Sequence, residues 1–473
     1  MVNFISKNNI IIFLFIFIIA FILRLIYFNQ LDSWFDEWNM LYTVDPNVSN
    51  EITWKRYFGD RGDGFLPEYY PPLNAFILKY FLNLFGYTTE SARIYSLIFG
   101  LSSCVAFYYL SNFFSKNNND YLSNYVFALN LFLIWQSSEI RPHSFVLFFS
   151  ILNLVLFINL IKNNKSTILI ISYLISSLIL LSSWPFALTI YIGKTAYLLV
   201  HYKKLNLPII KIFIIFSLII LIYVVLNYEY LIYHLKRDSH YTNLEISFFY
   251  SFHFRSFFGS IFLGAIFLIL FSFYLIKDFK ENALSKNDIN ILLYIIITTY
   301  FLVISYSILR AGVISPKYVI FILPLIIIWV CNKIVLSKYK KTISLIIFLS
   351  TTLNLILFFF DNPIKRPPFK DLIHLISNSD TKTIFTNETI VFSNSLKTYK
   401  KFGENNLFIL NNEELDLHKK FWFVCLNNPS FAVGDKVLPV EEKCKKFDNN
   451  NNYKVTDNID LRDFLIRKYE INE

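Results

Sequence analysis

Two adjacent carboxylates, Asp36 and Glu37, follow the first long apolar run of the sequence and lie between Trp34 and Trp38. An acidic side chain beside hydrocarbon is costly unless it is paired or used. A carboxylate held near a substrate hydroxyl can remove its proton, as a general base does. In the alternative interpretation, Asp36 caps a short helix at the membrane surface and the two tryptophans belong to an aromatic belt. The sequence alone leaves both interpretations open.

The segment that carries this pair, residues 29–90, contains more groups that could bind a substrate or a cation. Three further acids and a tyrosine follow the pair: Asp60, Asp63, Glu68 and Tyr70. Carboxylate oxygens are the ligands that divalent cations such as Mg²⁺ and Ca²⁺ prefer. No fixed spacing among these acids demands an ion, so a divalent metal is possible and no cofactor is certain. Asp63 and Tyr70 are candidate substrate contacts.

Basic side chains that could hold a phosphate lie at two turns farther along the chain. Arg141 is flanked by Glu139 and His143, which are candidate substrate contacts, and Lys317 lies in the later turn. Arginine can bind a phosphate through two parallel hydrogen bonds, and either cation can stabilise the charge of a phosphate leaving group. The alternative for both is a side chain that anchors a helix end at the membrane interface. Arg24, in the first apolar run, is a candidate substrate contact with the same alternative.

Membrane-spanning helices must position these residues. Of the 473 residues, 55% are hydrophobic and 16% are charged, against about 45–50% and about 25% in soluble domains. A bilayer core takes about 20 apolar residues per helix. Such runs cover eleven segments: 10–28, 91–114, 121–138, 144–161, 166–184, 186–201, 208–227, 257–276, 289–308, 318–332 and 342–360. We therefore expect a polytopic α-helical membrane protein, which excludes a soluble or disordered chain.

The net charge of +10 is distributed as in a membrane protein. The lysines fall in small groups between the apolar runs and form no basic patch, so we do not expect nucleic-acid binding. Groups such as Lys203–Lys204, Lys277–Lys286 and Lys338–Lys341 mark every second turn. Because positively charged loops stay in the cytoplasm, we expect a multi-pass protein of the plasma membrane with a cytoplasmic N-terminus and an extracytoplasmic tail.

A change of composition near residue 361 predicts a membrane domain at 1–361 and a small α/β domain at 362–473. Strands are expected at four short runs of the tail: Thr383–Phe385, Thr389–Phe392, Leu407–Leu410 and Phe421–Leu426. Helices are expected at Leu396–Phe402 and Asp460–Arg467. The tail has no glycine-rich phosphate loop. Cys425 and Cys444 could form a disulfide in an oxidising compartment or remain two thiols.

Four places along the chain carry a family resemblance. They are the Asp36-Glu37 pair, Tyr70-Pro71-Pro72-Leu73 with the later Ala92-Arg93, the Ser138–His143 turn, and Ser315-Pro316-Lys317-Tyr318. In this order the chain resembles the GT-C glycosyltransferases of the family 39 type, which include protein O-mannosyltransferases and lipid A aminoarabinose transferases. The resemblance extends over residues 1–370. Two positions depart from the family pattern, since His143 replaces a tyrosine and Lys317 replaces an arginine. Lysine keeps the charge but lacks the planar fork, which puts a bidentate phosphate contact at 317 in doubt.

The resemblance implies a sugar donor linked to a polyprenyl phosphate and an acceptor hydroxyl on a lipid, glycan or protein. Asp36 would be the base for that hydroxyl, while Glu37 would orient Asp36, contact the sugar or join a metal site. Arg141 and Lys317 would stabilise the donor phosphate. One base and a single displacement predict inversion at the sugar carbon, whereas a retaining route needs a second acid about 5 Å away.

Three other functions fit a polytopic membrane protein. A lipid-linked sugar transporter or flippase usually has spans interrupted by glycine and proline, whereas this chain has only 11 glycines and its acids lie in a loop. A polysaccharide polymerase or ligase usually has its main functional loop late in the chain, whereas here the acidic loop comes first. A non-catalytic relative would not need Asp36, Glu37 and Arg141. The sequence favours a transferase that acts among membrane lipids.

Overall fold

The contacts of the chain divide it into two compact units. The computed structural model describes residues 7–30, 32–58, 70–115, 121–162, 166–205, 209–229, 231–232, 246–281, 289–309, 313–361, 366–399, 408–409, 419–427, 442–447, 452–461 and 463–472. The first unit comprises Met1–Tyr27, Pro67–Asn74 and Ser96–Leu357, and the second comprises Phe28–Leu66, Ala75–Tyr95 and Phe358–Glu473. The last division lies close to the domain boundary predicted at 361, and the second unit also takes in most of the 29–90 segment.

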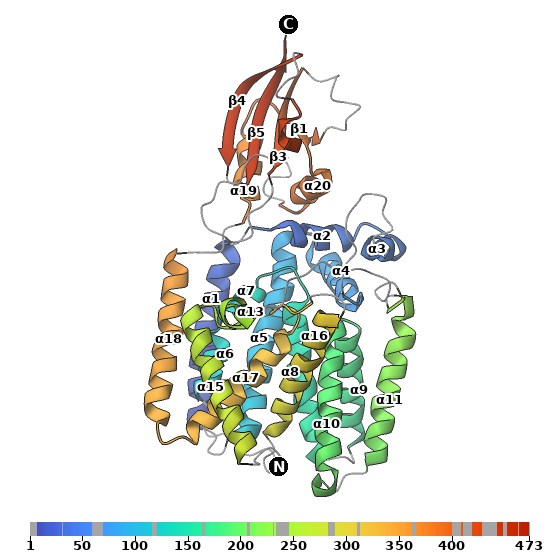
Figure 1. Ribbon diagram of the computed structural model, residues 1–473. Helices are drawn as coiled ribbons and strands as arrows, with labels where there is room; N and C mark the ends of the chain where they lie inside the picture. Colours follow the sequence, from blue (N-terminus) through green and yellow to red (C-terminus); the bar gives the residue numbers. More distant parts are fainter. Residues whose placement is uncertain are drawn as a thin grey trace. The chain divides into compact units, whose positions relative to one another are not determined.

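Long apolar helices make up the first unit, because a helix satisfies its backbone hydrogen bonds within itself, as lipid requires. Within the described ranges, six helices are long and apolar enough to cross a bilayer: α1 (Lys7–Gln30), α5 (Thr89–Phe114), α8 (His143–Lys162), α15 (Ile261–Lys280), α16 (Asn290–Leu309) and α18 (Lys340–Asp361). Shorter helices accompany them: α6 (Tyr121–Ala128), α7 (Leu131–Gln136), α9 (Thr167–Leu181), α10 (Leu188–Leu205), α11 (Ile209–Leu226), α13 (Ile246–Phe248), α14 (Phe254–Phe258) and α17 (Leu323–Val335). The predicted polytopic helical fold is confirmed (Figure 1).

The interior and the surface of this unit are both apolar. All residues of α17 from Leu323 to Cys331 are buried, and α17 packs against α6, α15 and α16. On α1 and α18, in contrast, large apolar side chains such as Phe15 (65% exposed) and Leu357 (57% exposed) lie at the surface. An apolar surface of this extent fits contact with lipid and not with water.

The run predicted as one span at 121–138 is divided into α6 and α7 by Asn130. The Asn130 side-chain oxygen accepts a hydrogen bond from the backbone N–H of Leu133 at 3.0 Å and so caps α7. Its side-chain amide donates to the carbonyl of Phe257 at 2.8 Å, at the end of α14. A buried asparagine therefore begins one helix and secures the end of another, because both groups would otherwise be unsatisfied.

The second unit combines short helices of the first loop with the carboxyl-terminal tail. The loop contributes α2 (Phe35–Thr43), α3 (Asn50–Tyr57) and most of α4 (Leu73–Phe85). Lys79 of α4 joins α3 and α4, since its ammonium donates to the carbonyl of Val48 at 2.7 Å and to the hydroxyl of Thr53 at 2.8 Å. Tyr87 donates to the carbonyl of Leu41 at 2.8 Å and so holds the end of α2. The described part of the loop, residues 32–58 and 70–90, is thus a packed structure.

The tail contains a mixed sheet with the strand order β2-β1-β3-β5-β4. Its strands are β1 (Thr383–Thr386), β2 (Phe408–Ile409), β3 (Lys420–Leu426), β4 (Tyr453–Leu461) and β5 (Phe464–Ile471). β1 is parallel to β2 and β3, and β5 is antiparallel to β3 and β4. Helices α19 (Phe369–Ser377) and α20 (Thr389–Thr398) pack their aromatic rings against Phe464. The predicted α/β domain is confirmed, with strands at three of the four runs expected.

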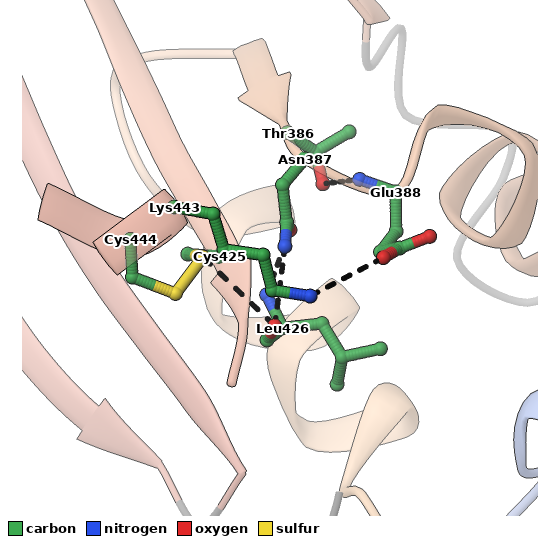
Figure 2. The surroundings of a disulfide bond; sticks show 7 residues. All are labelled: Thr386, Asn387, Glu388, Cys425, Leu426, Lys443 and Cys444. Atoms are coloured by element: carbon green, nitrogen blue, oxygen red, sulfur yellow. Dashed lines mark hydrogen bonds and ion pairs between the residues drawn. A yellow bond between two sulfur atoms is a disulfide. The ribbon is translucent and has the colours of Figure 1, made fainter. Parts of the chain in front are cut away.

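Of the two alternatives left open for the tail cysteines, the structure has the disulfide. Cys425 of β3 is bonded to Cys444 of a short 3₁₀ helix at Glu442–Lys445, and both lie in the aromatic core of the domain. Figure 2 shows how the neighbouring segment is held: the Asn387 side chain accepts from the Leu426 N–H at 2.9 Å and donates to its carbonyl at 3.2 Å. Closing a loop of 19 residues stabilises a domain by roughly 3 kcal/mol.

Two secondary-structure predictions in the tail are wrong. The run Thr389–Phe392, predicted as a strand, begins helix α20, which also contains the first three residues of the helix predicted at Leu396–Phe402. The buried side chains Val391, Ser395 and Thr398 recur at helical spacing. This stripe is hard to recognise in sequence because two of its members are small and polar. Packing of the stripe outweighs the β-propensity of the threonine, isoleucine and valine.

The helix predicted at Asp460–Arg467 is instead the hairpin of β4 and β5. The turn includes Asp463, which has a left-handed backbone with φ of 65°. Aspartate tolerates that conformation better than most residues and favours two-residue hairpin turns. Beyond the turn, Phe464 and Ile466 are buried while Leu465 is less so. This alternation, which marks a strand, was the signal that the helical interpretation missed.

Candidate active site

Five of the predicted site residues lie together in the first unit, although they come from three distant segments. They are Tyr70, Glu139, Arg141, His143 and Lys317, here called the Arg141 group. The Arg141 guanidinium donates to the hydroxyl of Tyr70 at 3.3 Å and lies 5.3 Å from the centre of its ring. His143 Nδ1 lies 3.6 Å from a carboxylate oxygen of Glu139. Arg141 and Lys317 both lie near enough to the His143 ring to act on it electrostatically.

Aromatic rings that the sequence did not single out support this group. The Trp184 ring stacks on Tyr70 with 4.5 Å between ring centres, and its N–H donates to the carbonyl of Tyr318 at 2.8 Å. Trp135 lies under Lys317, with the ammonium 5.7 Å from its ring centre. Offset rings and a cation over a ring face are favourable contacts. Trp184 follows two serines at the end of an apolar run, and that polar interruption is the signal that could have indicated it.

Short backbone contacts fix the turn that carries Glu139, Arg141 and His143. The Ser96 hydroxyl of α5 donates to the carbonyl of Glu139 at 2.5 Å, and Ser144 donates to that of Gln136 at 2.8 Å. At Gly100 of α5, an added Cβ atom would overlap the side chain of Ser137 and lie only 2.6 Å from its Cβ atom. Glycine is therefore required for α5 to approach this turn. The three side chains project from a backbone with little freedom.

The Arg141 group combines two cations with few competing acids in a buried setting. Arg141 is 8% exposed, and His143 and Glu139 are buried almost completely. Electrostatic attraction is strong where water is scarce. Glu139 and His143 lie close to each other, one turn of helix apart in the chain. The arrangement is suited to an oxyanion bound by Arg141 and Lys317, with Tyr70 as a further hydroxyl donor.

The acidic pair of the first loop lies in the second unit, where Glu37 and Asp36 have different surroundings. The Glu37 carboxylate is completely buried, and it accepts hydrogen bonds from the backbone N–H of Trp34 at 3.2 Å and from Arg366 at 2.5 Å. A second guanidinium, that of Arg93, lies 3.6 Å away. Glu37 is the third residue of α2 and closes its first turn, as the acid of a capping box does. The Glu37 carboxylate is therefore occupied by contacts that hold the first turn of α2.

Asp36, the other member of the pair, is only partly buried. Successive helical residues point about 100° apart, so Asp36 and Glu37 cannot share one face of α2. Asp36 is the second residue of α2, where the positive end of the helix dipole favours a carboxylate. The suggestion that Asp36 caps this helix is not needed, because Glu37 makes the contact to Trp34.

Asp32 is a further acid of this region that the sequence did not single out as a site residue. One carboxylate oxygen accepts from the hydroxyl of Tyr399 and from the backbone N–H of Ser33 at 3.1 Å. The other accepts from the backbone N–H of Lys370 at 3.1 Å. Tyr399 and Lys370 lie more than 300 positions along the chain, in the tail, so no local pattern could have indicated these contacts.

Arg24 is buried, and its hydrogen bonds are internal to the first unit. Its guanidinium donates to the hydroxyl of Ser137 at 3.2 Å, to the carbonyl of Ala128 at 2.8 Å and to that of Ala20 at 3.1 Å. With 1% of its surface exposed, it does not extend toward a lipid headgroup. Ala128 is the last residue of α6, so the cation lies at the negative end of that helix.

Asp63 lies outside the described residues, as do Asp60 and Glu68. The part of the chain that the structure describes contains no cluster of three or more histidine, cysteine, aspartate or glutamate side chains that could hold a metal ion. The metal site suggested by the loop acids therefore stays a prediction.

We expect Arg24 to stabilise the fold and not to bind substrate. Replacing it by glutamine (Arg24→Gln) removes the charged hydrogen-bond donor to the carbonyl of Ala128 and to the hydroxyl of Ser137. Such a loss costs about 1.5–3 kcal/mol. Thermal unfolding of the purified protein in detergent should occur at a lower temperature, with little change in the KM for donor. Arg255→Gln, at an exposed position of α14, is the matched control. A raised KM with unchanged unfolding would contradict this role.

Comparison with known proteins identifies the fold. No protein-family model and no curated protein matches this sequence. The fold is similar to the crystal structure of ArnT from Cupriavidus metallidurans bound to undecaprenyl phosphate, with a TM-score of 0.57 and 9% sequence identity. The match covers 98% of this chain and 98% of that chain. ArnT has the GT-C fold, and at this identity the likeness is one of fold. The chain is therefore a polytopic membrane protein with the GT-C fold that its motifs predicted.

Proposed function

We propose that the protein is a membrane glycosyltransferase that moves a sugar from a polyprenyl-phosphate-linked donor to an acceptor hydroxyl on the extracytoplasmic face. The observation that carries the proposal is the Arg141 group, which assembles a buried arginine, a partly buried lysine and a hydroxyl donor from three distant segments. Buried cations in a membrane protein are costly unless they are used. The similarity of the fold to ArnT, whose structure contains undecaprenyl phosphate, supports a polyprenyl phosphate as the ligand.

The proposed chemistry needs one base and one site for an oxyanion. The acceptor oxygen attacks the anomeric carbon while the bond from that carbon to the phosphate oxygen breaks. The polyprenyl phosphate leaves with the electron pair, and its growing charge is stabilised by Arg141 and Lys317. Asp36 accepts the proton of the acceptor hydroxyl. A phosphate is a weak base, so it leaves without a general acid, and this single displacement inverts the sugar carbon.

Glu37 has a different role in this proposal. It is buried between Arg93 and Arg366, and it closes the first turn of α2. A carboxylate buried between two guanidinium groups and a backbone N–H is occupied by contacts that hold the backbone around it. Of the three roles considered for Glu37, the contacts favour the one in which it orients Asp36.

The orientation in the membrane is also part of the proposal. Disulfides persist in oxidising compartments and are rare in the cytosol, so the Cys425–Cys444 bond supports an extracytoplasmic tail. The lysine-rich turns, which should lie in the cytoplasm, predict the same orientation. We infer a multi-pass protein of the inner membrane with a cytoplasmic N-terminus. The acceptor is then a lipid, glycan or protein of the cell envelope.

Replacing the proposed base should abolish transfer without loss of the fold. Asp36→Asn removes the proton acceptor from α2 but keeps a side chain of the same size. General-base catalysis contributes about 10²–10⁴ in rate, so we expect at least a hundredfold lower transfer. The measurement is mass spectrometry of envelope glycans and lipids from cells that express wild type or variant, followed by assays with the polyprenyl-phosphate sugar so identified. Glu51→Gln, on exposed α3 of the same loop, is the control. Wild-type transfer by Asp36→Asn would refute the assignment of the base.

Removing the guanidinium of Arg141 should weaken the stabilisation of the leaving phosphate. We expect Arg141→Gln to lower kcat/KM by about 10²–10³, as loss of one transition-state donor does. Arg141→Lys should retain part of the activity, since it keeps the charge but loses the fork. Product inhibition by undecaprenyl phosphate should need higher concentrations in Arg141→Gln. Unchanged kinetics and inhibition in that variant, with Arg255→Gln as the control, would argue against a phosphate site.

A cysteine placed on the tail should be accessible from outside the cell. Asp457 lies at an exposed position of β4, and the free cysteines Cys104 and Cys331 are buried in the first unit. We expect Asp457→Cys to react with a membrane-impermeant maleimide in intact spheroplasts. In denaturant, wild type should present two thiols without reductant and four with it, whereas Cys425→Ser, which leaves Cys444 as a thiol, should present three in either case. Labelling of Asp457→Cys that requires lysis would place the tail in the cytoplasm.

A further inference from the structure

Helix α2 is too short to be stable without help from the rest of the second unit. It has nine residues, of which five are buried. Isolated helices shorter than about 12–15 residues are marginal in water. The residue at its N-cap is Trp34, which has no side-chain oxygen to satisfy the first N–H groups. The start of the helix must therefore be held by contacts from elsewhere in this unit.

Arg366, a residue of the tail, makes the first of these contacts. One nitrogen of its guanidinium donates to the Glu37 carboxylate at 2.5 Å and to the backbone carbonyl of Asp32 at 2.9 Å. Its guanidinium carbon lies 5.7 Å from the centre of the Trp34 ring. One tail side chain thus reaches residues on both sides of the start of α2. Both partners are buried or partly buried, where charged hydrogen bonds are strong.

Tyr399, at the end of α20, makes the second contact. Its hydroxyl donates to the Asp32 carboxylate and accepts from the backbone N–H of Ser33 at 3.2 Å. Burial, together with the neighbouring Asp32 charge, raises the pKa of Tyr399 well above its ordinary value. The phenol therefore keeps its proton and remains a donor to Asp32. Tyr399 thus holds the residues just before α2 through the side chain of Asp32 and the backbone of Ser33.

Aromatic packing supplies the third contact. The ring of Trp38, which is completely buried, meets the rings of Phe369 and Tyr399 edge-on, with 5.3 Å between centres in each case. Edge-to-face contacts of this kind are favourable beyond the area they bury. The tail therefore fixes residues 32–34 before Asp36 and residues 37–38 after it. The backbone is therefore held in place on each side of Asp36.

From these contacts we propose that Arg366 and Tyr399 are positioning residues for the transfer reaction, which hold α2 so that Asp36 is presented to the acceptor hydroxyl. The inference rests on the function proposed above for Asp36, whereas the contacts themselves do not. It assigns the tail a part in catalysis, although it is separated from Asp36 by more than 300 residues of sequence. A misplacement of about 1 Å in a catalytic group can cost about a hundredfold in rate.

Kinetics of single tail variants test this inference. We expect Tyr399→Phe and Arg366→Gln to lower kcat by about tenfold to a hundredfold, with the donor KM changed less than about threefold. Arg366→Lys should recover part of the rate, because it restores a cation beside Glu37. Tyr469→Phe in β5 and Lys443→Gln, which breaks a surface ion pair with Glu388, are the matched controls. Wild-type kcat in both Tyr399→Phe and Arg366→Gln would overturn the inference.

Hydrogen exchange provides a second readout that does not depend on activity. In Tyr399→Phe, amides of residues 33–43 should exchange at least about tenfold faster than in wild type, while those of β5 should be unchanged. If Arg366→Gln fails to fold, Tyr399→Phe decides the question, since it removes a single hydroxyl. Unchanged exchange at α2 in Tyr399→Phe would refute the positioning contacts. Faster exchange at α2 in a protein whose wild type transfers no sugar would instead refute the proposed function and leave the contacts standing.

Discussion

The burial of the Glu37 charge between two guanidinium groups is the interaction on which the second unit depends. A carboxylate withdrawn from water is tolerated only if cations and hydrogen-bond donors surround it. Arg93, Arg366 and the N–H of Trp34 meet that demand. Because these partners come from α5, from the tail and from the start of α2, satisfying one charge joins three segments of the chain. The same contact gives Glu37 a structural place, while Asp36, its neighbour in the pair, is only partly buried.

In the first unit, the buried charges are cations. Arg24 and Arg141 both lie inside a unit whose surface is largely apolar. Arg24 is satisfied by a serine and two helix carbonyls, so its charge serves the fold. Arg141 instead meets a tyrosine hydroxyl and ring within an aromatic surround that includes Trp184. Two arginines that look alike in sequence thus have different surroundings, and the difference lies in the partners that each one meets.

The apolar runs predicted the helices of the first unit because lipid demands long, self-satisfied helices and leaves a strong signal. The tail left weaker signals. Its strand β3 is recognisable since it is apolar on both faces, while the sequence of α20 favours a strand because the buried stripe of the helix includes the polar Ser395 and Thr398. The sequence at the Asp463 hairpin favours a helix, because the alternation of Phe464 and Ile466 is short. In each case packing against the rest of the domain outweighed local propensity.

The sequence by itself determined that the chain is a polytopic helical membrane protein, and its ordered motifs indicated the GT-C fold and the Arg141 group. These features depend on composition, periodicity and local motifs, which a linear chain displays directly. Only the tertiary structure decided that Glu37 is held by Arg366, that Asp32 and Tyr399 secure the start of α2, and that Trp184 supports Tyr70. Those partners are more than a hundred positions apart in the chain. Contacts across such separations are set by how helices and strands pack, and packing cannot be read from the sequence of either partner alone.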